Sequence, residues 1–307
     1  MSEQKTPTRA TVSVLVAGVL WSFSGVLIKA VHWDFMRIAG VRSMVAAAIQ
    51  FSFLVWLFRR RSSQRQSFFS TAGGAFASVF APSKPHWLGA IAFVLNMLAL
   101  AWAFRLTNAT NAVFLHYSGI VLVALLSYRV LKQPLKRSDW NALALATFGI
   151  FLFCVDGFQL NAPLGTALGV SCGLTLATTQ LCLGLRARDK SGENGALETI
   201  LLGNLITSVI ALPLILSDPT NLPPSRDWWL LLALGIFPWG LPDLIYVFAI
   251  EKVPLFRALI LGLSDPILTA VWPLLFLHEY PTPLAIVGSA IVLWAIIYQA
   301  NAARKLE

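Results

Sequence analysis

The segment ATNAVFLHYSGIVLVALLSYRV, residues 109–130, decides how the rest of the chain is interpreted. It is long enough to cross a membrane as a helix, because about 20 mostly apolar residues span the hydrocarbon core. Its apolar residues run on without alternation, which argues against a strand of a membrane β-barrel. Yet His116, Tyr117 and Ser118 lie at its centre, where polar side chains are costly unless they face protein or water.

The composition of the whole chain agrees with a membrane protein. Of its 307 residues, 57% are hydrophobic and 12% are charged, and the mean hydropathy is +0.72. Soluble domains carry about 25% charged residues. Backbone polar groups in lipid must be satisfied within their own segment, so such runs predict helices. We expect ten, at about 10–29, 35–58, 86–104, 108–128, 140–155, 163–185, 196–216, 227–250, 255–277 and 284–298.

Membrane topology explains the net charge of +9. With a cytoplasmic N-terminus, eighteen of the 23 Lys and Arg residues fall on cytoplasmic tails and loops, four on the other side, and Arg42 inside a helix. This positive-inside pattern predicts that both termini are cytoplasmic. The charge therefore predicts contact with membrane lipid, including anionic headgroups, and no nucleic acid as a partner. The oligomeric state is left open.

The sequence contains no signature of an enzyme, a metal site or a cofactor site. The motifs HExxH and GxSxG and the phosphate loop are absent. The three cysteines form neither a CxxC pair nor a metal-ligand spacing, so we expect no disulfide and no metal. We predict no catalytic residues and no cofactor. A membrane enzyme or scaffold stays open as an alternative, with His116, Asp243 and Asp265 as its dispersed ionisable groups.

A weak internal repeat divides the chain into two halves. Shifted by 146 positions, Leu88-Gly89 falls on Leu234-Gly235, and helix and loop spacing agree from the third to the fifth helix. Five crossings are an odd number, so the second half would be inverted relative to the first, as in many secondary transporters. Alternatively, duplication supplied only a stable bundle.

The expected fold is therefore an all-α membrane protein with ten transmembrane helices in two inverted five-helix repeats around a central cavity. The first repeat covers residues 10–155 and the second 156–300, with cytoplasmic tails at 1–9 and 301–307. The fifth and tenth helices carry no comparable polar centre, so we expect them to pack outside the others.

Three segments resemble the drug/metabolite transporter superfamily, specifically its ten-helix members built from two EamA-type repeats. They are GVLWSFSGVLIK from Gly18, RIAGVRSMVAAA around Arg42, and LGLSDPILTAVWPLLFLHEYPTPLAIVGSAIVL from Leu261. The resemblance extends over nearly the whole chain, about 10–298.

The last segment is the most specific of the three. It has Pro266 within the ninth helix, Glu279 at the helix end and a step of small residues from Gly288. The first half departs from this pattern, because Ile120 replaces the expected proline and Gln133 the expected glutamate. Those two positions therefore do not support the resemblance in the first half.

The resemblance implies an exporter of the bacterial plasma (inner) membrane that works by alternating access. Within the superfamily the chain is most similar to the bacterial aromatic amino-acid exporter group, which implies aromatic or other apolar amino acids and related small metabolites as substrates. A carrier of the same fold for nucleotide-sugars or phosphorylated metabolites is the alternative. Such a carrier needs a basic cavity, and Arg42 alone is plainly basic and intramembrane.

Polar side chains within the predicted helices are the candidate substrate-binding residues, because they usually face a bundle interior or a water-filled path. The set comprises Trp21, Asn96, His116, Tyr117, Ser118, Trp239, Asp243, Tyr246 and Asp265. Arg42 is a candidate for gating or for attracting a carboxylate, and a structural pairing role is its alternative. For His116, Tyr117 and Ser118 the alternative is a helix–helix hydrogen bond far from substrate.

Both aspartates belong to predicted helices that contain proline and glycine, residues that weaken a helix. Trp239, Asp243 and Tyr246 are spaced i, i+4, i+7 and share a face beside a Pro- and Gly-rich stretch. Asp243 could bind an ammonium group or a proton, or could accept hydrogen bonds from freed backbone amides. Asp265 shares a face with Thr269 and has the same two interpretations. In the sixth helix, glycines at 165, 169 and 173 predict close helix packing.

Overall fold

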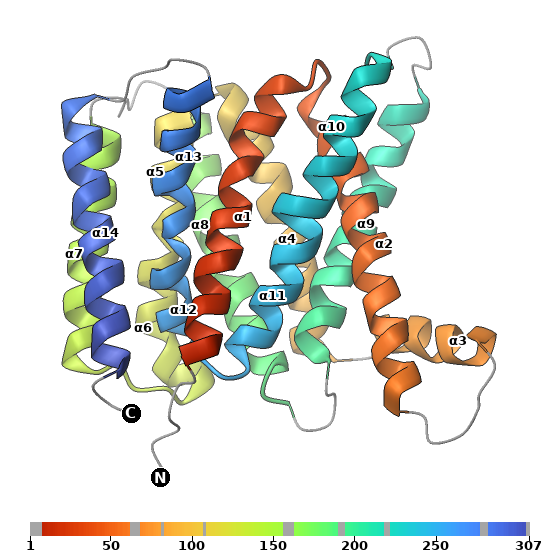
Figure 1. Cartoon of the computed structure of the whole chain (residues 1–307), viewed down its shortest axis with the longest axis horizontal. Helices are drawn as coiled ribbons and strands as arrows, with labels where there is room; N and C mark the ends of the chain where they lie inside the picture. Colours follow the sequence, from red (N-terminus) through yellow and green to blue (C-terminus); the bar gives the residue numbers. More distant parts are fainter. Residues whose placement is uncertain are drawn as a thin grey trace.

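The computed structural model describes residues 8–61, 68–80, 83–106, 109–155, 163–189, 194–217, 222–276 and 282–304, and its regular elements there are helices (Figure 1). In chain order they are α1 (Thr8–Ala30), α2 (Phe35–Arg61), α3 (Phe68–Val79), α4 (Lys84–Leu106), α5 (Ala109–Tyr117), α6 (Gly119–Leu131), α7 (Arg137–Cys154), α8 (Pro163–Arg186), α9 (Gly195–Leu216), α10 (Ser225–Gly235), η2 (Ile236–Gly240), α11 (Leu241–Ile250), α12 (Leu255–Gly262), α13 (Ser264–Phe276) and α14 (Pro283–Arg304). Glu279 and residues 156–162, at the junction of the predicted halves, lie outside the described residues.

Seven helical stretches of the described residues are long and apolar enough to cross a membrane. They are Thr8–Ala30, Phe35–Arg61, Ala112–Leu131, Pro163–Arg186, Gly195–Leu216, Ser225–Ile250 and Pro283–Ala302. A shorter apolar stretch, Lys84–Leu100, lies within α4. The predicted all-helical membrane architecture thus agrees with the structure, whereas the count of ten stays a prediction.

Three of the predicted helices are interrupted near their middle. The segment 109–130 divides at Ser118 into α5 and α6, and α12 divides from α13 at Leu263. Between α10 and α11 the chain stays helical but forms the π-helical turn Ile236–Gly240. The break predicted beside Asp243 is therefore a wider helical turn. Such irregularities re-aim side chains and often mark functional sites. Asp243 follows the π-helical turn, and Asp265 follows the division at Leu263.

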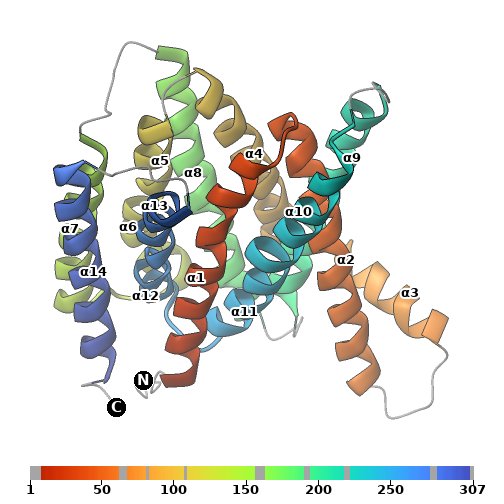
Figure 2. The ribbon, with the colours of Figure 1, turned by 45° about the horizontal axis from the view of Figure 1, so that its top comes forward.

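Helices α7 and α14 form a pair at one edge of the bundle (Figures 1 and 2). Glycines allow the two backbones to approach closely: a methyl group added at Gly149 would lie 2.8 Å from the carbonyl oxygen of Gly288. Small residues at such crossings are typical of membrane helices, where van der Waals packing drives association. The position of this pair agrees with the expectation that the fifth and tenth predicted helices pack outside the others.

The centre of the bundle is built around α1 and α8. Helix α1 packs against α11 and α13, and α8 packs against α4 and α5. A methyl group at Gly173 on α8 would lie 2.6 Å from Ser118 Oγ and 2.7 Å from the Leu115 carbonyl oxygen, and one at Gly169 would meet the Leu115 side chain. The close packing predicted for the glycine motif is therefore confirmed at Gly169 and Gly173.

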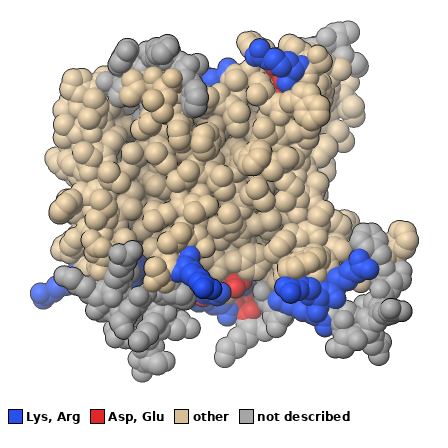
Figure 3. Space-filling model, viewed as in Figure 1, with Lys and Arg blue, Asp and Glu red and all other residues tan. Residues whose placement is uncertain are grey.

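Lys and Arg side chains gather at one end of the bundle, where α1 begins and α14 ends, and a broad uncharged band separates them from a smaller basic group at the other end (Figures 1 and 3). We call the first the basic end. The described ends of α2, α6, α7 and α8 contribute Arg59, Arg60, Arg61, Arg129, Arg137 and Arg186. The distribution matches the charge asymmetry on which the predicted topology rests.

Buried ion pairs tie helix ends together at the basic end. Asp139, at the start of α7, accepts hydrogen bonds from Arg257 Nε on α12 at 3.3 Å and from Gln299 Nε2 on α14 at 2.7 Å. On the other side of the bundle, Arg186 at the end of α8 pairs with Glu198 on α9 at 3.3 Å and with Asp189 at 2.9 Å. These contacts join α7 to α12 and α14, and α8 to α9, at the basic end.

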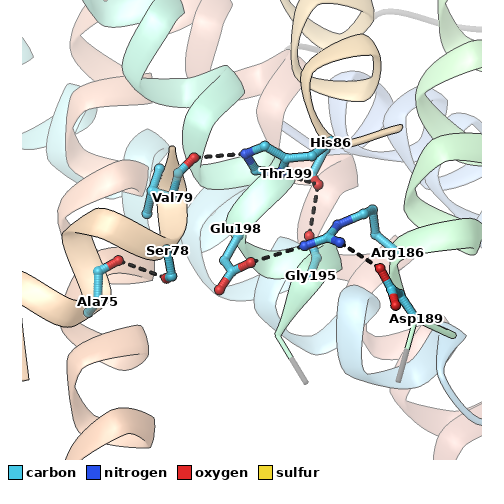
Figure 4. A network of polar contacts seen from close by, with 9 residues as sticks. All are labelled: Ala75, Ser78, Val79, His86, Arg186, Asp189, Gly195, Glu198 and Thr199. Atoms are coloured by element: carbon cyan, nitrogen blue, oxygen red, sulfur yellow. Dashed lines mark hydrogen bonds and ion pairs between the residues drawn. The ribbon is translucent and has the colours of Figure 1, made fainter. Parts of the chain in front are cut away.

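Helix α3 was not predicted, and it lies across the other helices at the basic end (Figures 1 and 2). His86 holds it in place. One ring nitrogen of His86 lies 2.7 Å from the carbonyl oxygen of Val79, the last residue of α3, and the other lies 2.9 Å from Thr199 Oγ1 on α9 (Figure 4). The His86 side chain is fully buried. The histidine thus links α3, α4 and α9 in one polar network.

Candidate functional site

The buried carboxylate of Asp243 is held by side chains from the other end of the sequence. Trp21 Nε1 on α1 donates a hydrogen bond to Asp243 Oδ1 at 3.2 Å. Gln50 Nε2 on α2 donates to Oδ2 at 3.3 Å, and Asn204 on α9 donates in turn to Gln50 Oε1 at 3.2 Å. The donors are side chains rather than freed backbone amides. The purely local alternative for Asp243 therefore does not describe its contacts.

Asp265, at the start of α13, is held in a similar way. Tyr117 Oη on α5 donates to Asp265 Oδ2 at 3.0 Å, and Thr269 Oγ1 donates to Oδ1 at 3.1 Å. Thr269 also approaches the carbonyl oxygen of Ser22 at 3.3 Å, and Trp272 Nε1 donates to Ser22 Oγ at 2.8 Å. Asp265 is therefore connected to α5 and, through Thr269, to α1.

Two consecutive residues of α1 bring these groups together. Trp21 contacts Asp243, and Ser22 contacts the neighbours of Asp265. The Trp21 ring also packs on the ring of Tyr246, with centroids 5.2 Å apart, and Tyr246 Oη donates to Gln180 on α8 at 2.7 Å. We call this set the central cluster. Its members are Trp21, Ser22, Gln50, Tyr117, Gln180, Asn204, Asp243, Tyr246, Asp265, Thr269 and Trp272.

The two carboxylates of the central cluster have uncharged hydrogen-bond donors. Within the described residues, no Lys or Arg nitrogen lies within 4.0 Å of Asp243 or Asp265. Burying a carboxylate without a cationic partner is expensive, so such a group readily takes up a proton or a cationic ligand. Chemically, the cluster can therefore receive a proton or an ammonium group, and its aromatic faces can stack on an apolar body.

Arg42 lies beside the central cluster, and its guanidinium stacks on a tryptophan. The Arg42 Cζ atom is 3.6 Å from the centroid of the Trp239 ring, and Nη2 lies 3.1 Å from Met97 Sδ on α4. Trp239 belongs to the π-helical turn. The structure thus joins Trp239 to Arg42, while Trp21 takes the place beside Asp243 and Tyr246 that the sequence spacing suggested for Trp239.

Asn96, His116 and Ser118 form a separate group around α8. Asn96 Nδ2 donates to the Cys172 carbonyl oxygen at 2.8 Å and lies 3.5 Å from His116 Nδ1. Ser118 Oγ donates to the Leu115 carbonyl oxygen at 2.5 Å and packs on Gly173. Asn96 thus joins α4 to α8 and reaches His116 on α5, whereas the Ser118 hydrogen bond is local to its own segment. His116 still touches the central cluster, since its ring packs edge-on against Tyr117 with centroids 5.2 Å apart.

One small cavity lies beside Tyr117 of the central cluster. A cavity of about 10 Å³ borders Tyr117 and Pro266, with room for no more than one water molecule. A larger cavity of about 360 Å³ opens at the basic end, next to Arg186 and Arg188. The central side chains therefore contact one another here.

Gln50, Asn204 and Ser22 belong to the central cluster although sequence reasoning did not select them. Each is a polar side chain within an apolar run, and each is at least 99% buried. Gln50 follows Arg42 by eight residues, which places both on one face of α2. The rule that polar residues within membrane helices face protein could have found them.

Comparison with known proteins gives a family and a fold. Residues 8–155 and 168–299 match the EamA-like transporter family. A solved structure titled "Crystal structure of protein" superimposes with a TM-score of 0.75 at 17% sequence identity, covering 96% of this chain and 98% of that chain. At this identity the likeness concerns the fold alone. A search of curated proteins finds no match.

Proposed function

Because the chain belongs to the EamA-like transporter family, and is thus a multi-pass membrane transporter of small solutes, we propose that it exports amino acids, in particular aromatic and other apolar ones. The observation that carries the proposal is that aromatic side chains donate to two carboxylates, Trp21 to Asp243 and Tyr117 to Asp265. Trp21 and the neighbouring Ser22 of α1 bring the two acids into one cluster. Carboxylates suit the ammonium group of an amino acid, and the rings of Trp21, Tyr117 and Tyr246 suit an apolar side chain.

The proposal includes ten membrane crossings, divided between two inverted halves, residues 10–155 and 156–300. The helix contacts support this division, because replacing each helix by its counterpart in the other half gives the same set of packed pairs. Helix α1 packs on α11 and α13, and its counterpart α8 packs on α4 and α5, while α2 pairs with α9 and α7 with α14. The two matched ranges, 8–155 and 168–299, give similar support. Every contact between Trp21 or Tyr117 and an aspartate then crosses from one half to the other.

Alternating access follows from such a division. The cavity at the basic end reaches Leu131 and Gly184. A methyl group at Gly184 would lie 3.1 Å from side-chain carbons of both Leu131 and Leu255, so these residues form a tight apolar contact beneath the cavity. We assign this contact to a gate that separates the basic end from the central cluster. The charge asymmetry supports a cytoplasmic basic end and insertion in the bacterial inner membrane.

The test is counterflow in proteoliposomes with a panel of labelled solutes. The panel contains Phe, Trp, Leu, Thr, a sugar phosphate and a nucleotide-sugar, with protein-free vesicles as the blank. We expect exchange of Phe, Trp and Leu above the blank, and none of the phosphorylated solutes. Exchange of the nucleotide-sugar or the sugar phosphate instead would assign the chain to a different substrate class.

A further inference from the structure

The guanidinium of Arg42 is deeply buried and mostly unpaired. Arg42 is 2% exposed. Its Nη2 atom has only the sulfur of Met97 as a partner, and Nε and Nη1 have no hydrogen-bond partner among the described residues. A buried arginine normally pairs with a carboxylate or another strong acceptor, because removing the charge from water is otherwise very unfavourable.

Trp239 adds a further unused donor at the same place. Its Nε1 atom is buried and has no acceptor among the described residues. Because the Arg42 Cζ atom lies 3.6 Å from the ring centroid, the indole N–H lies beside the guanidinium. Stacking on the indole satisfies the charge of Arg42 in part but none of its N–H groups. Three buried nitrogens on two stacked groups therefore lack acceptors.

No protein oxygen accepts a hydrogen bond from Arg42 or from Trp239 Nε1 in the described part of the chain. The carboxylate of Asp243 accepts from Trp21 and Gln50 instead. No ion pair joins Asp243 or Asp265 to Arg42 within 4.0 Å there. These donors therefore need an acceptor from outside the protein. A guanidinium group binds best to an anionic oxygen.

We propose that Arg42 and Trp239 form an anion subsite that binds the carboxylate of the transported solute. The proposal rests on the proposed function and narrows its substrate class to molecules that carry a carboxylate on an apolar body. A phosphate would use the same donors, so the experiment below contains both anions. A single guanidinium with one indole N–H matches the charge of a carboxylate better than the two charges of a phosphate monoester.

The subsite also orients the solute. Arg42 precedes Gln50 by eight residues on one face of α2, a separation of about 12 Å along the helix axis. Gln50 contacts Asp243, so the anion subsite lies nearer the start of α2, away from the basic end. A carboxylate at Arg42 would leave the rest of the solute to extend toward Trp21, Tyr246 and Asp243.

The experiment measures ligand-induced thermal stabilisation of the purified full-length protein. The probes are four compounds with one phenyl body: phenylalanine, 3-phenylpropionate, phenethylamine and phenyl phosphate. The variants are Arg42→Gln, which removes the charge, and Trp239→Phe, which keeps a ring but removes the N–H. Trp294→Phe, at a tryptophan that is 61% exposed on α14, is the control. Trp239→Phe keeps the test informative if Arg42→Gln fails to fold.

The subsite predicts that affinity for phenylalanine and 3-phenylpropionate falls at least tenfold in Arg42→Gln and about threefold in Trp239→Phe, since hydrogen bonds to charged groups are the strong ones. Affinity for phenethylamine should not change, and Trp294→Phe should match the wild type. Equal weakening of all four probes, or no weakening, would overturn the subsite. Tighter binding of phenyl phosphate than of 3-phenylpropionate would overturn the choice of carboxylate.

The proposed function can fail separately. If the wild-type protein exchanges phenylalanine in vesicles but Arg42→Gln binds both carboxylates normally, the transport function stands and the subsite falls. If the wild-type protein exchanges none of the amino acids and binds neither carboxylate, both fall.

Discussion

Trp21 and Asp243 lie 222 positions apart in the sequence and are joined by a hydrogen bond of 3.2 Å from the indole N–H to the carboxylate. The bond connects α1, near the N-terminus, with the start of α11, directly after the π-helical turn. Trp21 therefore both donates to a buried acid and packs on Tyr246. Removing the donor and removing the ring should have different consequences.

The variant Trp21→Phe removes the donor and keeps a ring against Tyr246. Losing a hydrogen bond to a buried carboxyl group should lower the free energy of unfolding by about 1–3 kcal/mol. Solute exchange should slow at least several-fold, because Asp243 loses one of its two donors. Unfolding in denaturant and counterflow in vesicles measure the two effects. Trp294→Phe, on the exposed face of α14, should change neither.

Tyr117 and Asp265 should be energetically coupled, because the tyrosine hydroxyl donates to the carboxylate at 3.0 Å. In a double-mutant cycle with Tyr117→Phe and Asp265→Asn, we expect a coupling free energy of about 1–2 kcal/mol. The measurement is the free energy of unfolding of the four proteins. Additive effects within about 0.3 kcal/mol would mean that the hydrogen bond contributes nothing to stability.

A methyl group at Gly173 should disturb the contact of α8 with α5. The added carbon would lie 2.6 Å from Ser118 Oγ and 2.7 Å from the Leu115 carbonyl oxygen, so the backbones must separate. We expect Gly173→Ala to destabilise the protein by about 1–3 kcal/mol. The matched control is Gly73→Ala on α3, where an added methyl group meets nothing within 4 Å. Equal stability of the two variants would contradict the packing described for α8.

His86 should hold α3 against the bundle. Replacing it by phenylalanine removes the contacts with Val79 and Thr199. Amide hydrogen exchange over 68–79 should then accelerate at least tenfold, while exchange in α8 stays as in the wild type. Ser78→Ala is the control, because Ser78 donates only to the Ala75 carbonyl oxygen within its own helix. Unchanged protection of α3 in the histidine variant would show that other contacts hold it.

Much of the helical framework could be predicted from the sequence, because lipid imposes long apolar runs whatever the tertiary contacts are. Helix α3 escaped prediction since it is short and follows the basic residues Arg59, Arg60 and Arg61, a stretch read as a loop. Its position depends on the contact between His86 and Val79. No local pattern encodes a contact of that kind.

Several residues of the candidate site could be predicted from the sequence, but the contacts between them could not. Trp21, Tyr117, Asp243, Tyr246 and Asp265 all belong to the central cluster. Their partners could not be derived from spacing, because helices that are apolar on every side do not reveal which faces meet. For the same reason Asn96 and Ser118 were grouped with the site, whereas Asn96 donates to α8 and Ser118 to the Leu115 carbonyl oxygen three residues earlier. Gln50 and Asn204 were not selected, although each is a polar side chain within an apolar run.

The central claim is that the acids of the central cluster lie on the path of the transported solute. The most direct test is counterflow of labelled phenylalanine in vesicles that contain equal amounts of wild-type protein, Asp243→Asn or Trp294→Phe. We predict exchange by the wild type and by Trp294→Phe, and a loss of at least tenfold in Asp243→Asn with the protein still folded. Wild-type exchange rates in folded Asp243→Asn would contradict it.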